Sequence, residues 1–195
     1  PVIALETQAR FRSLLEAFSW PGRPVRLETG PLPCTAARYL MAVAETLLDH
    51  EVTFAIIGDG LVEGDARSLS DQVRLRTGAR PARPDEAEFV FVRGTAGRVI
   101  HELPVGEPEF PDRGATLIWR VDGFAGGLSA TLRGPGIDGA RPLRLAGVAA
   151  ADLLALGQIN QAYPLGLDTL FVDDQGTIVG LPRSTSIELD SSAVI

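Results

Sequence analysis

Lysine is absent from this sequence, and all 18 of its basic residues are arginine. The absence excludes a lysine-derived Schiff base, the lysine of a phosphate-binding P-loop and a lysine general base. A single cysteine, Cys34, rules out a disulfide within the chain and is typical of a reducing compartment. We therefore expect a cytoplasmic protein whose cationic contacts are all made by guanidinium groups.

Long apolar runs are also lacking. No stretch approaches the ~20 residues of a membrane-spanning helix, and nothing near Pro1 is typical of a signal peptide. The formal net charge is -7, whereas proteins that bind nucleic-acid backbones need a basic stripe. His50 and His101 have no ligand-type partner at helical spacing, so no metal site is predicted. We expect neither a membrane nor a nucleic acid as partner.

A length of 195 residues fits one domain, residues 1–195, with room for a substantial core. Its most telling stretch is a predicted β-hairpin with strands at 169–172 and 177–181. The intervening segment 173–176, Asp-Asp-Gln-Gly, is rich in turn-forming residues. Residues 170–172 are consecutively apolar, so both faces of that strand should be covered, as in a layered α/β core.

Hydrophobic spacing predicts the other elements. Phe11, Leu14, Leu15 and Phe18 follow the i, i+3, i+4, i+7 pattern of an amphipathic helix over 5–18. Further helices are expected at 35–49, 70–77 and 148–163, a short helical turn at 97–103, a loop at 104–111, and strands at 25–27, 52–57, 89–92, 115–121 and 128–132. The last two strands are expected to pair antiparallel across the glycine-rich segment 122–127, with one face open to water or to a partner.

Two arginines are placed where a rigid backbone would present a guanidinium to phosphate, phosphonate or carboxylate. Arg133 opens an Arg-Gly-Pro-Gly segment, and Arg183 follows a proline directly after the hairpin. Each could equally be a surface charge or an ion-pair member. Asp168, at the start of the hairpin, could orient a substrate hydroxyl or bracket the strand. The predicted ligand-binding or interface residues are Arg133, Gly134, Gly136, Asp168 and Arg183, and no catalytic residue is predicted.

Three further features have plain structural interpretations. Segment 58–60, Gly-Asp-Gly, could cradle a phosphate or form an ordinary turn, but it lacks the third glycine of a dinucleotide fingerprint. Cys34 opens a predicted helix, a location that lowers a thiol pKa, yet no histidine accompanies it. Glu86 and Glu88 lie in a proline-containing link, where solvated charge is the default interpretation.

Six segments occur in an order that is more specific than any one of them. They are Phe11-Arg12-x-Leu-Leu-x-Ala-x-Ser-x-Pro21-Gly22, Ser70 with Arg74-x-Arg76-Thr77, residues 114–118, Leu132-x-Gly134-x-Gly136-Ile137, residues 164–168 and residues 181–185. In this order they resemble PhnH, the subunit family of the phosphonate carbon-phosphorus lyase system. The resemblance extends over residues 11–188, nearly the whole chain.

The resemblance implies an accessory subunit of the carbon-phosphorus lyase core complex, with PhnG, PhnI and PhnJ as partners in bacterial phosphonate catabolism. With PhnL, such a complex displaces adenine from ATP by an alkylphosphonate and forms ribose 1-phosphonate 5-triphosphate; the nucleosidase chemistry is ascribed to PhnI. The resemblance also implies an α/β layered domain with a central mixed β-sheet flanked by helices. This fold is similar to the large domain of pyridoxal-phosphate-dependent transferases without the cofactor, and the absence of lysine agrees, because no internal aldimine can form.

The isolated chain is expected to form a twofold homodimer, through the alternating strand pair or the hairpin edge. Two alternatives stay open. One is a stand-alone enzyme or binding protein that holds a phosphorylated or phosphonate ligand through Arg133 and Arg183. The other is a pure assembly scaffold, whose function would survive alanine at both arginines.

Overall fold

The protein is represented by a computed structural model that describes residues 2–29, 37–58 and 63–190, with side chains from residue 5 onward except 63–68. Its centre is a seven-stranded mixed sheet. In chain order the strands are Val25–Arg26 (β1), Thr53–Ile57 (β2), Arg80–Pro81 (β3), Phe89–Arg93 (β4), Thr116–Val121 (β7), Asp168–Asp173 (β10) and Thr177–Leu181 (β11). Their spatial order is β1-β11-β10-β7-β4-β2-β3. The strands from β10 to β3 run parallel, and β11 is antiparallel to both its neighbours.

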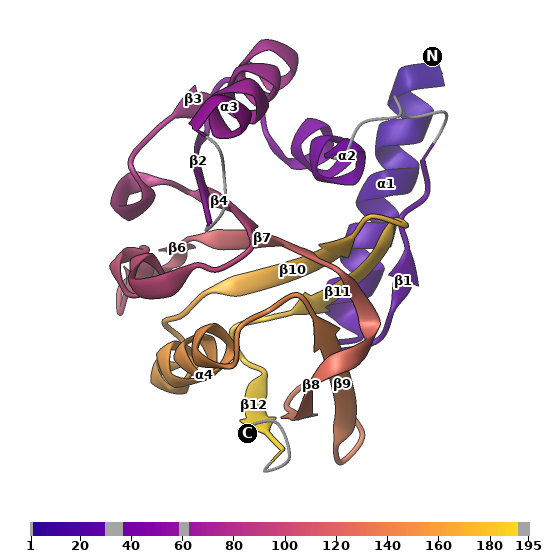
Figure 1. The fold of residues 1–195 in the computed structure, drawn as a ribbon, viewed down its shortest axis with the longest axis vertical. Helices are drawn as coiled ribbons and strands as arrows, with labels where there is room; N and C mark the ends of the chain where they lie inside the picture. Colours follow the sequence, from indigo (N-terminus) through magenta and orange to yellow (C-terminus); the bar gives the residue numbers. More distant parts are fainter. Residues whose placement is uncertain (1, 30–36, 59–62, 191–195) are drawn as a thin grey trace.

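Helices and two small sheets cover the two faces of this sheet (Figure 1). The helices are α1 (Val2–Ser19), α2 (Arg38–Leu47), α3 (Glu63–Thr77) and α4 (Ala150–Ile159), with 3-10 turns η1 (Pro84–Glu86), η2 (Gly97–Glu102) and η3 (Asn160–Ala162). The small sheets are β5 (Val105–Glu107) with β6 (Phe110–Gly114), and β12 (Ser186–Leu189) with β8 (Gly123–Arg133) and β9 (Arg141–Ala146). No helix in the described ranges is long and apolar enough to cross a membrane.

Each face has its own apolar core. Leu14, Leu40 and Val73, from the first three helices, pack on one face of the large sheet. Leu132 and Leu153, from β8 and α4, belong to the core on the other face. Burying both faces explains why the central strands are apolar at consecutive positions, since neither side of the sheet meets water.

The predicted hairpin is confirmed. Strands β10 and β11 pair antiparallel, with Leu170 opposite Gly180 and Val172 opposite Ile178. Gly176 ends the turn at φ 82°, a conformation that favours glycine. A Cβ atom there would lie 2.4 Å from the ring of Tyr39, so α2 packs directly against this turn.

The predicted pairing of strands 115–121 and 128–132 is wrong. β7 instead lies between β4 and β10, and β8 pairs with β9 and β12. Segment 122–127 is not a turn, because β8 already begins at Gly123. The expected wet face of the first strand is also absent, since Ile118 on that face is fully buried. The alternation of polar and apolar residues in these two strands came from threonines and arginines near the strand ends, such as Thr116, Arg120 and Arg133. It did not indicate an exposed strand face.

Other expectations need smaller corrections. Strands β3, β9 and β12 were not predicted, and the predicted loop 104–111 contains β5 and the start of β6. α3 begins at Glu63, seven residues before the predicted start. In α1, Leu14 is buried, whereas Phe11 and Leu15 are 45% and 51% exposed. The predicted helix start at residue 35 lies outside the described residues.

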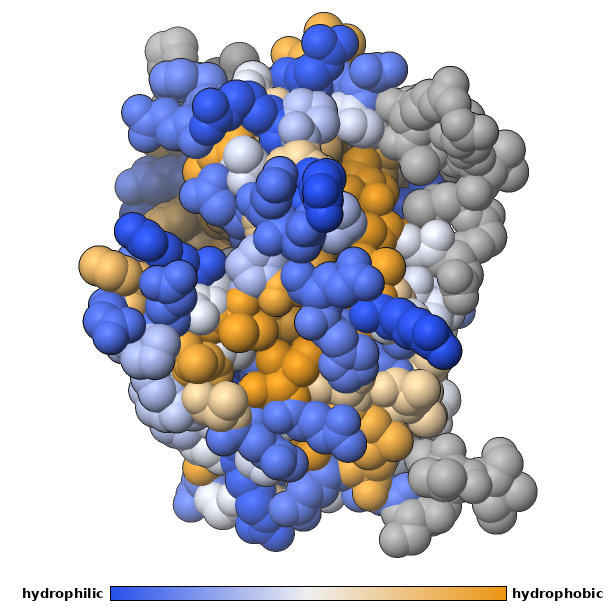
Figure 2. All heavy atoms as spheres, turned by 90° about the vertical axis from the view of Figure 1, so that its left-hand side faces the viewer, coloured by the Kyte–Doolittle hydropathy of each residue, from blue (hydrophilic) through white to orange (hydrophobic). Residues whose placement is uncertain are grey.

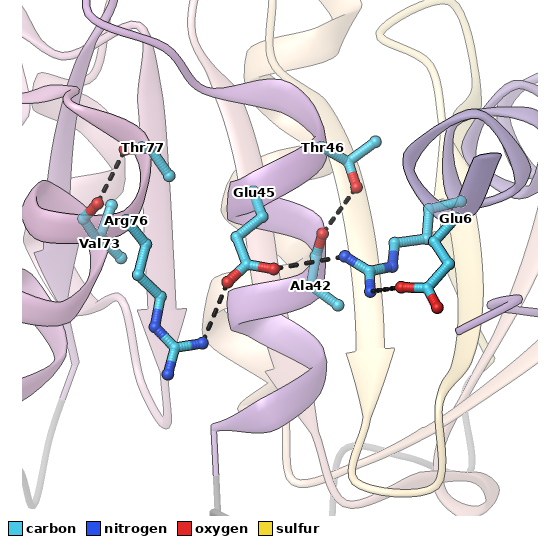
Figure 3. Close-up of polar contacts among 8 residues, drawn as sticks. Glu6, Ala42, Glu45, Thr46, Val73, Arg76 and Thr77 are labelled. Carbon is cyan, nitrogen blue, oxygen red and sulfur yellow. Dashed lines mark hydrogen bonds and ion pairs between the residues drawn. The ribbon is translucent and has the colours of Figure 1, made fainter. Parts of the chain in front are cut away.

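Charged side chains tie the three helices of one face together (Figure 3). Arg10 of α1 donates to Glu45 of α2 at 3.3 Å and lies 3.6 Å from Glu6. Arg76 of α3 donates to the other oxygen of Glu45 at 3.0 Å. The Arg10 side chain is only 8% exposed, so Glu45 compensates a nearly buried charge.

Candidate functional site

Two of the predicted site residues form a close ion pair at the ends of the hairpin strands. Oδ1 of Asp168 accepts the backbone N–H of Arg183 at 2.8 Å. Its Oδ2 accepts Nε at 3.0 Å and Nη2 at 2.5 Å. The two side chains are 29% and 13% exposed. The pair therefore fixes where the chain leaves β11, through charge-assisted hydrogen bonds in which Nε and Nη2 of Arg183 share one carboxylate oxygen.

The same arginine also anchors the β5–β6 hairpin. Its Nη1 donates to the carbonyl oxygen of Pro111. A Cβ atom at Gly114 would lie 2.7 Å from this Nη1 and 2.6 Å from the carbonyl oxygen of Gly166, so glycine is needed there for close approach. All three guanidinium nitrogens of Arg183 thus make contacts within the chain.

Gly134 and Gly136 allow the turn after β8 to pack closely. Both have positive φ values, 145° and 81°. A Cβ atom on Gly134 would lie 2.8 Å from the carbonyl oxygen of Ser184, and one on Gly136 would lie 2.9 Å from that of Ser19. The turn is therefore fitted between the loop that contains Arg183 and the end of α1.

Arg133 lies at the exposed end of β8. It pairs in register with Ser186, three residues after Arg183, and its Nη1 donates to the carbonyl oxygen of Gly139 at 3.4 Å. The predicted residues thus gather around the loop 182–185. Within the gathering, Asp168 and Arg183 contact each other directly, and no contact joins the guanidinium groups of Arg133 and Arg183.

A pocket of about 640 Å³ opens at the amino ends of β2, β4 and β7, beside the hairpin that Arg183 anchors. It is lined by Val52, Glu86, Ala87, Glu88, Phe89, Pro104, Asp112, Arg113, Gly114 and Thr116. Figure 2 shows the side of the molecule that carries β3 and β6, where hydrophilic residues surround smaller hydrophobic areas and part of the surface is recessed. Three carboxylates against one guanidinium suit a cationic group in the pocket better than a phosphonate.

Two charged residues of the pocket make specific contacts: Glu88, which was interpreted as solvated charge, and Arg113, for which nothing was predicted. Glu88 accepts the backbone N–H of Thr53 at 2.8 Å and its hydroxyl at 3.1 Å, so it joins the starts of β2 and β4. Arg113 lies 4.2 Å from the ring centre of Phe110, a cation–π distance. The rim of the pocket is therefore held by specific contacts.

At the opposite, carboxyl edge of the sheet, Arg120 joins two acidic residues. It donates to both oxygens of Asp174, with Nε at 3.3 Å, and to Asp122. The hydrogen bond with Asp174 raises the pKa of the Arg120 guanidinium above its ordinary value, against the lowering effect of burial, and Asp122 adds to the rise. Arg120 therefore keeps its charge at every pH at which the protein is handled.

The PhnH family model, described as bacterial phosphonate metabolism protein, matches residues 3–188. The chain belongs to the PhnH family. The resemblance based on six sequence segments is thereby confirmed, and it extends to nearly the same residues. Family membership associates the chain with bacterial phosphonate metabolism.

Two curated relatives resemble this PhnH family member over almost their whole lengths. One, named as the C-P lyase subunit protein HtxG of Stutzerimonas stutzeri, is 36% identical over 183 residues, which cover 93% of this chain and 86% of that protein. The other is subunit PhnH of alpha-D-ribose 1-methylphosphonate 5-triphosphate synthase from Rhizobium meliloti (strain 1021). It is 33% identical over 187 residues, 94% of this chain and 90% of that protein.

Two buried polar residues of this PhnH chain were missed by the sequence reasoning. Asp152 in α4 is 2% exposed and accepts the backbone N–H groups of Ala96 and Gly97 at 2.9 and 3.0 Å. The side-chain amide of Asn160 donates a hydrogen bond to the carbonyl oxygen of Leu167 and accepts one from its backbone N–H. Asp152 is the one charged residue of α4, whose other residues are apolar or glycine except Gln158, and that isolation is a signal that could have identified it.

Two weaker sequence candidates lie outside the described residues: Cys34, and positions 59 and 60 of the Gly-Asp-Gly segment. Within the described part of this PhnH chain, no group of three or more histidine, cysteine or acidic side chains is arranged to hold a metal ion.

Proposed function

We propose that the chain is an accessory subunit of the complex that activates alkylphosphonates in phosphonate catabolism. It supports the formation of ribose 1-phosphonate 5-triphosphate from ATP and alkylphosphonate, together with the subunits PhnG, PhnI and PhnJ, in the cytoplasm. The observation that carries the proposal is the near full-length similarity to a synthase subunit PhnH and to a C-P lyase subunit protein.

The contacts of the candidate residues support an accessory role. The guanidinium of Arg183 donates hydrogen bonds to the carboxylate of Asp168 and the carbonyl oxygen of Pro111. These bonds hold the loop after β11 and the β5–β6 hairpin in place. A residue that acts on substrate would instead direct donors into a cavity. We therefore assign Asp168 and Arg183 to shaping the surface that partner subunits meet.

The surface of α1 supplies an apolar area for such a partner. Leu5, Phe11 and Leu15 of α1, and Trp20 directly after its end, are 66%, 45%, 51% and 49% exposed, although they are large apolar side chains. Phe11 and Leu15 lie one helical turn apart and therefore share a face. Figure 1 shows α1 at the periphery of the molecule. Exposed apolar groups of this kind mark protein–protein contacts, and we assign this face to a partner subunit or, in the isolated chain, to a second copy in a homodimer.

We further propose that the fold corresponds to the large domain of pyridoxal-phosphate-dependent transferases. The sequence contains no lysine that could hold the cofactor as an aldimine, so the residues present do not fit this cofactor.

The experiment that tests the proposal is reconstitution. PhnG, PhnI and PhnJ, together with PhnL, are mixed with ATP and methylphosphonate, with and without this chain, and the ribose 1-phosphonate 5-triphosphate formed is measured by phosphorus NMR. We expect product only when the chain is present and co-elutes with the other subunits. Equal product without the chain, or product from the chain alone, would contradict the accessory role.

A variant pair tests the α1 face in the same assay. Leu15→Glu is expected to weaken co-elution of the chain with its partners, and Leu75→Glu serves as the control. Leu75 lies on α3 and is 77% exposed, so its substitution adds the same charge at a different exposed helix. If both variants co-elute with the partner subunits as completely as the wild-type chain does, the α1 face is not the contact surface. Size-exclusion chromatography of the two isolated variants reports separately on the homodimer.

A further inference from the structure

The carboxyl edge of the large sheet has a point where the chain leaves in opposite directions. After β2 the chain forms α3, whose Leu69 and Val73 belong to the core on one face. After β4 it forms η2, whose Ile100 belongs to the core on the other face. β2 and β4 are neighbours. In open α/β sheets a crevice forms at such a switch point, outside the carboxyl ends of the strands, and ligands bind there.

Arg93 is the last residue of β4 and therefore stands at this switch point. It is partly buried, yet its side chain makes no hydrogen bond or ion pair with any residue in the described ranges. The backbone of β2 comes very close here, since a Cβ atom on Gly58 would lie 1.8 Å from the carbonyl oxygen of Arg93. A residue larger than glycine at position 58 would therefore collide with the backbone of Arg93.

A second arginine lies on the strand next to Arg93. β4 and β7 are parallel, and Arg93 is in register with Arg120, two positions after the register pair Phe91 and Ile118. Phe91 and Ile118 both belong to the core beneath α1, α2 and α3. Because side chains alternate along a strand, Arg93 and Arg120 emerge on that same face, at neighbouring strand ends.

Charged side chains of both signs lie at this edge of the sheet. Arg120 is neutralised by Asp122 and Asp174. Arg38, the first residue of α2, adds a further guanidinium, which donates to the backbone oxygen of Asp174 at 3.4 Å. Asp173, the last residue of β10, lies at the same edge and accepts the backbone N–H groups of Gln175 and Thr177, so three arginines and three aspartates are placed there. Arg93 is partly buried and has no acidic partner among the described residues, so its guanidinium remains available for an external anion.

We propose that Arg93 binds the phosphoryl or phosphonyl oxyanion of a small molecule at the carboxyl end of β4, next to the strand end that carries the neutralised Arg120. A guanidinium presents parallel N–H donors that match two oxygens of such a group. The inference is independent of the subunit role proposed above, because it concerns binding by the chain itself.

Isothermal titration of the purified chain in low-chloride buffer tests the proposal. The probes are inorganic phosphate, methylphosphonate and ATP, and their relative affinities tell a free phosphate, a phosphonate and a nucleotide phosphate apart. We expect at least one probe to bind at a single site with a dissociation constant below about 1 mM, roughly -4 kcal/mol. If none of the three binds to the wild-type chain, the proposal is overturned.

Matched variants locate the site. Arg93→Gln is expected to weaken binding at least about tenfold, the effect of losing one charge-assisted contact. Arg144→Gln, at an exposed position of β9, removes the same charge elsewhere and should bind as wild type does. Unchanged affinity of Arg93→Gln would overturn the assignment, as would an equal loss with Arg144→Gln.

A conservative substitution keeps the test informative if Arg93→Gln fails to fold, as judged by circular dichroism. Arg93→Lys keeps the charge but loses the parallel donors. We expect it to fold and to bind a few times more weakly than wild type does. Wild-type affinity in Arg93→Lys would mean that the guanidinium fork is not used, and would contradict the proposal.

Discussion

Asp168 holds Arg183 through both of its carboxylate oxygens, one on the backbone N–H and the other on the guanidinium. The two residues are 15 positions apart and stand at the start of β10 and just after β11. Through Pro111 the same arginine reaches β6, whose residues line the pocket at the amino ends of the strands. One ion pair therefore sets the position of three segments.

Substitution Asp168→Asn keeps the shape of the side chain but leaves the charge of Arg183 unpaired at 13% exposure. We expect it to lower the free energy of unfolding by about 2 kcal/mol, measured by urea denaturation. The control is Asp85→Asn, which breaks the pair with Arg83, whose side chain is 74% exposed. The control should cost less than about 0.5 kcal/mol, because exposed pairs contribute little. Equal losses in the two variants would contradict a structural role for Asp168.

The contact between Arg10 and Glu45 leads to a second prediction. Arg10 is nearly buried, and its Nε has no hydrogen-bond partner, so its charge depends on Glu45 and Glu6. Glu45→Gln should lower the free energy of unfolding by about 1–2 kcal/mol. Arg76→Gln removes only the outer half of the cluster in Figure 3, at 43% exposure, and should cost less than about 0.5 kcal/mol.

Urea denaturation of both variants measures the two losses of unfolding free energy. The losses can be compared directly if the dependence of the free energy on urea concentration is the same in both variants. A loss with Arg76→Gln as large as that with Glu45→Gln would show that the link between α2 and α3, rather than the buried Arg10, dominates.

Asp152 provides a third prediction. Its two oxygens accept the backbone N–H groups of Ala96 and Gly97 at the start of η2. Asp152→Ala leaves the N–H of buried Ala96 without a partner, while exposed Gly97 can bond to water, so the substitution should cost about 1–3 kcal/mol of unfolding free energy. Hydrogen exchange should also accelerate at Ala96 and Gly97. Asp49→Ala is the control, since exposed Asp49 accepts one N–H, from Glu51, and its loss should cost less than about 1 kcal/mol. Unchanged exchange at Gly97 in Asp152→Ala would refute this capping role.

The sequence indicates elements well where the local pattern and the tertiary environment agree. The hairpin of β10 and β11 has apolar strands and a turn rich in acidic residues and glycine, and every local preference favours the same structure. α1 was likewise predicted from its spacing. Its buried face was not, because Leu15 and Phe11 fit an apolar stripe equally well whether a sheet or a partner subunit covers it.

Pairing between distant strands could not be read from the pattern. β7 and β8 are consecutive and alternate in polarity, which is typical of a hairpin, yet β7 belongs to the large sheet and β8 to a small one. The sequence identified Asp168 and Arg183 as candidates but not their mutual contact. The sequence offered no reason to connect Arg93 with Arg120. The two residues are 27 positions apart and become neighbours only through the parallel register of β4 and β7.

The last prediction concerns the packing of α1 on the sheet at Gly180. This residue lies inside β11, and a Cβ atom there would be 2.7 Å from both the carbonyl carbon and the carbonyl oxygen of Ala17. These are backbone atoms, which cannot move aside without shifting the helix. Gly180→Ala should therefore cost about 1–3 kcal/mol of unfolding free energy, although alanine is otherwise no worse than glycine in a strand. Hydrogen exchange in α1 should accelerate at the same time.

Gly157→Ala is the matched control, because it adds the same methyl group inside α4. The nearest atom to its Cβ is the carbonyl oxygen of Ile187 at 3.2 Å, so the crowding is milder than at Gly180. Alanine also favours a helix interior by up to about 1 kcal/mol over glycine. The two effects oppose each other, so the free energy of unfolding should change by less than about 1 kcal/mol. If Gly180→Ala proved as stable as Gly157→Ala, α1 would have freedom to move on β11, and its exposed apolar face could not be a fixed docking surface.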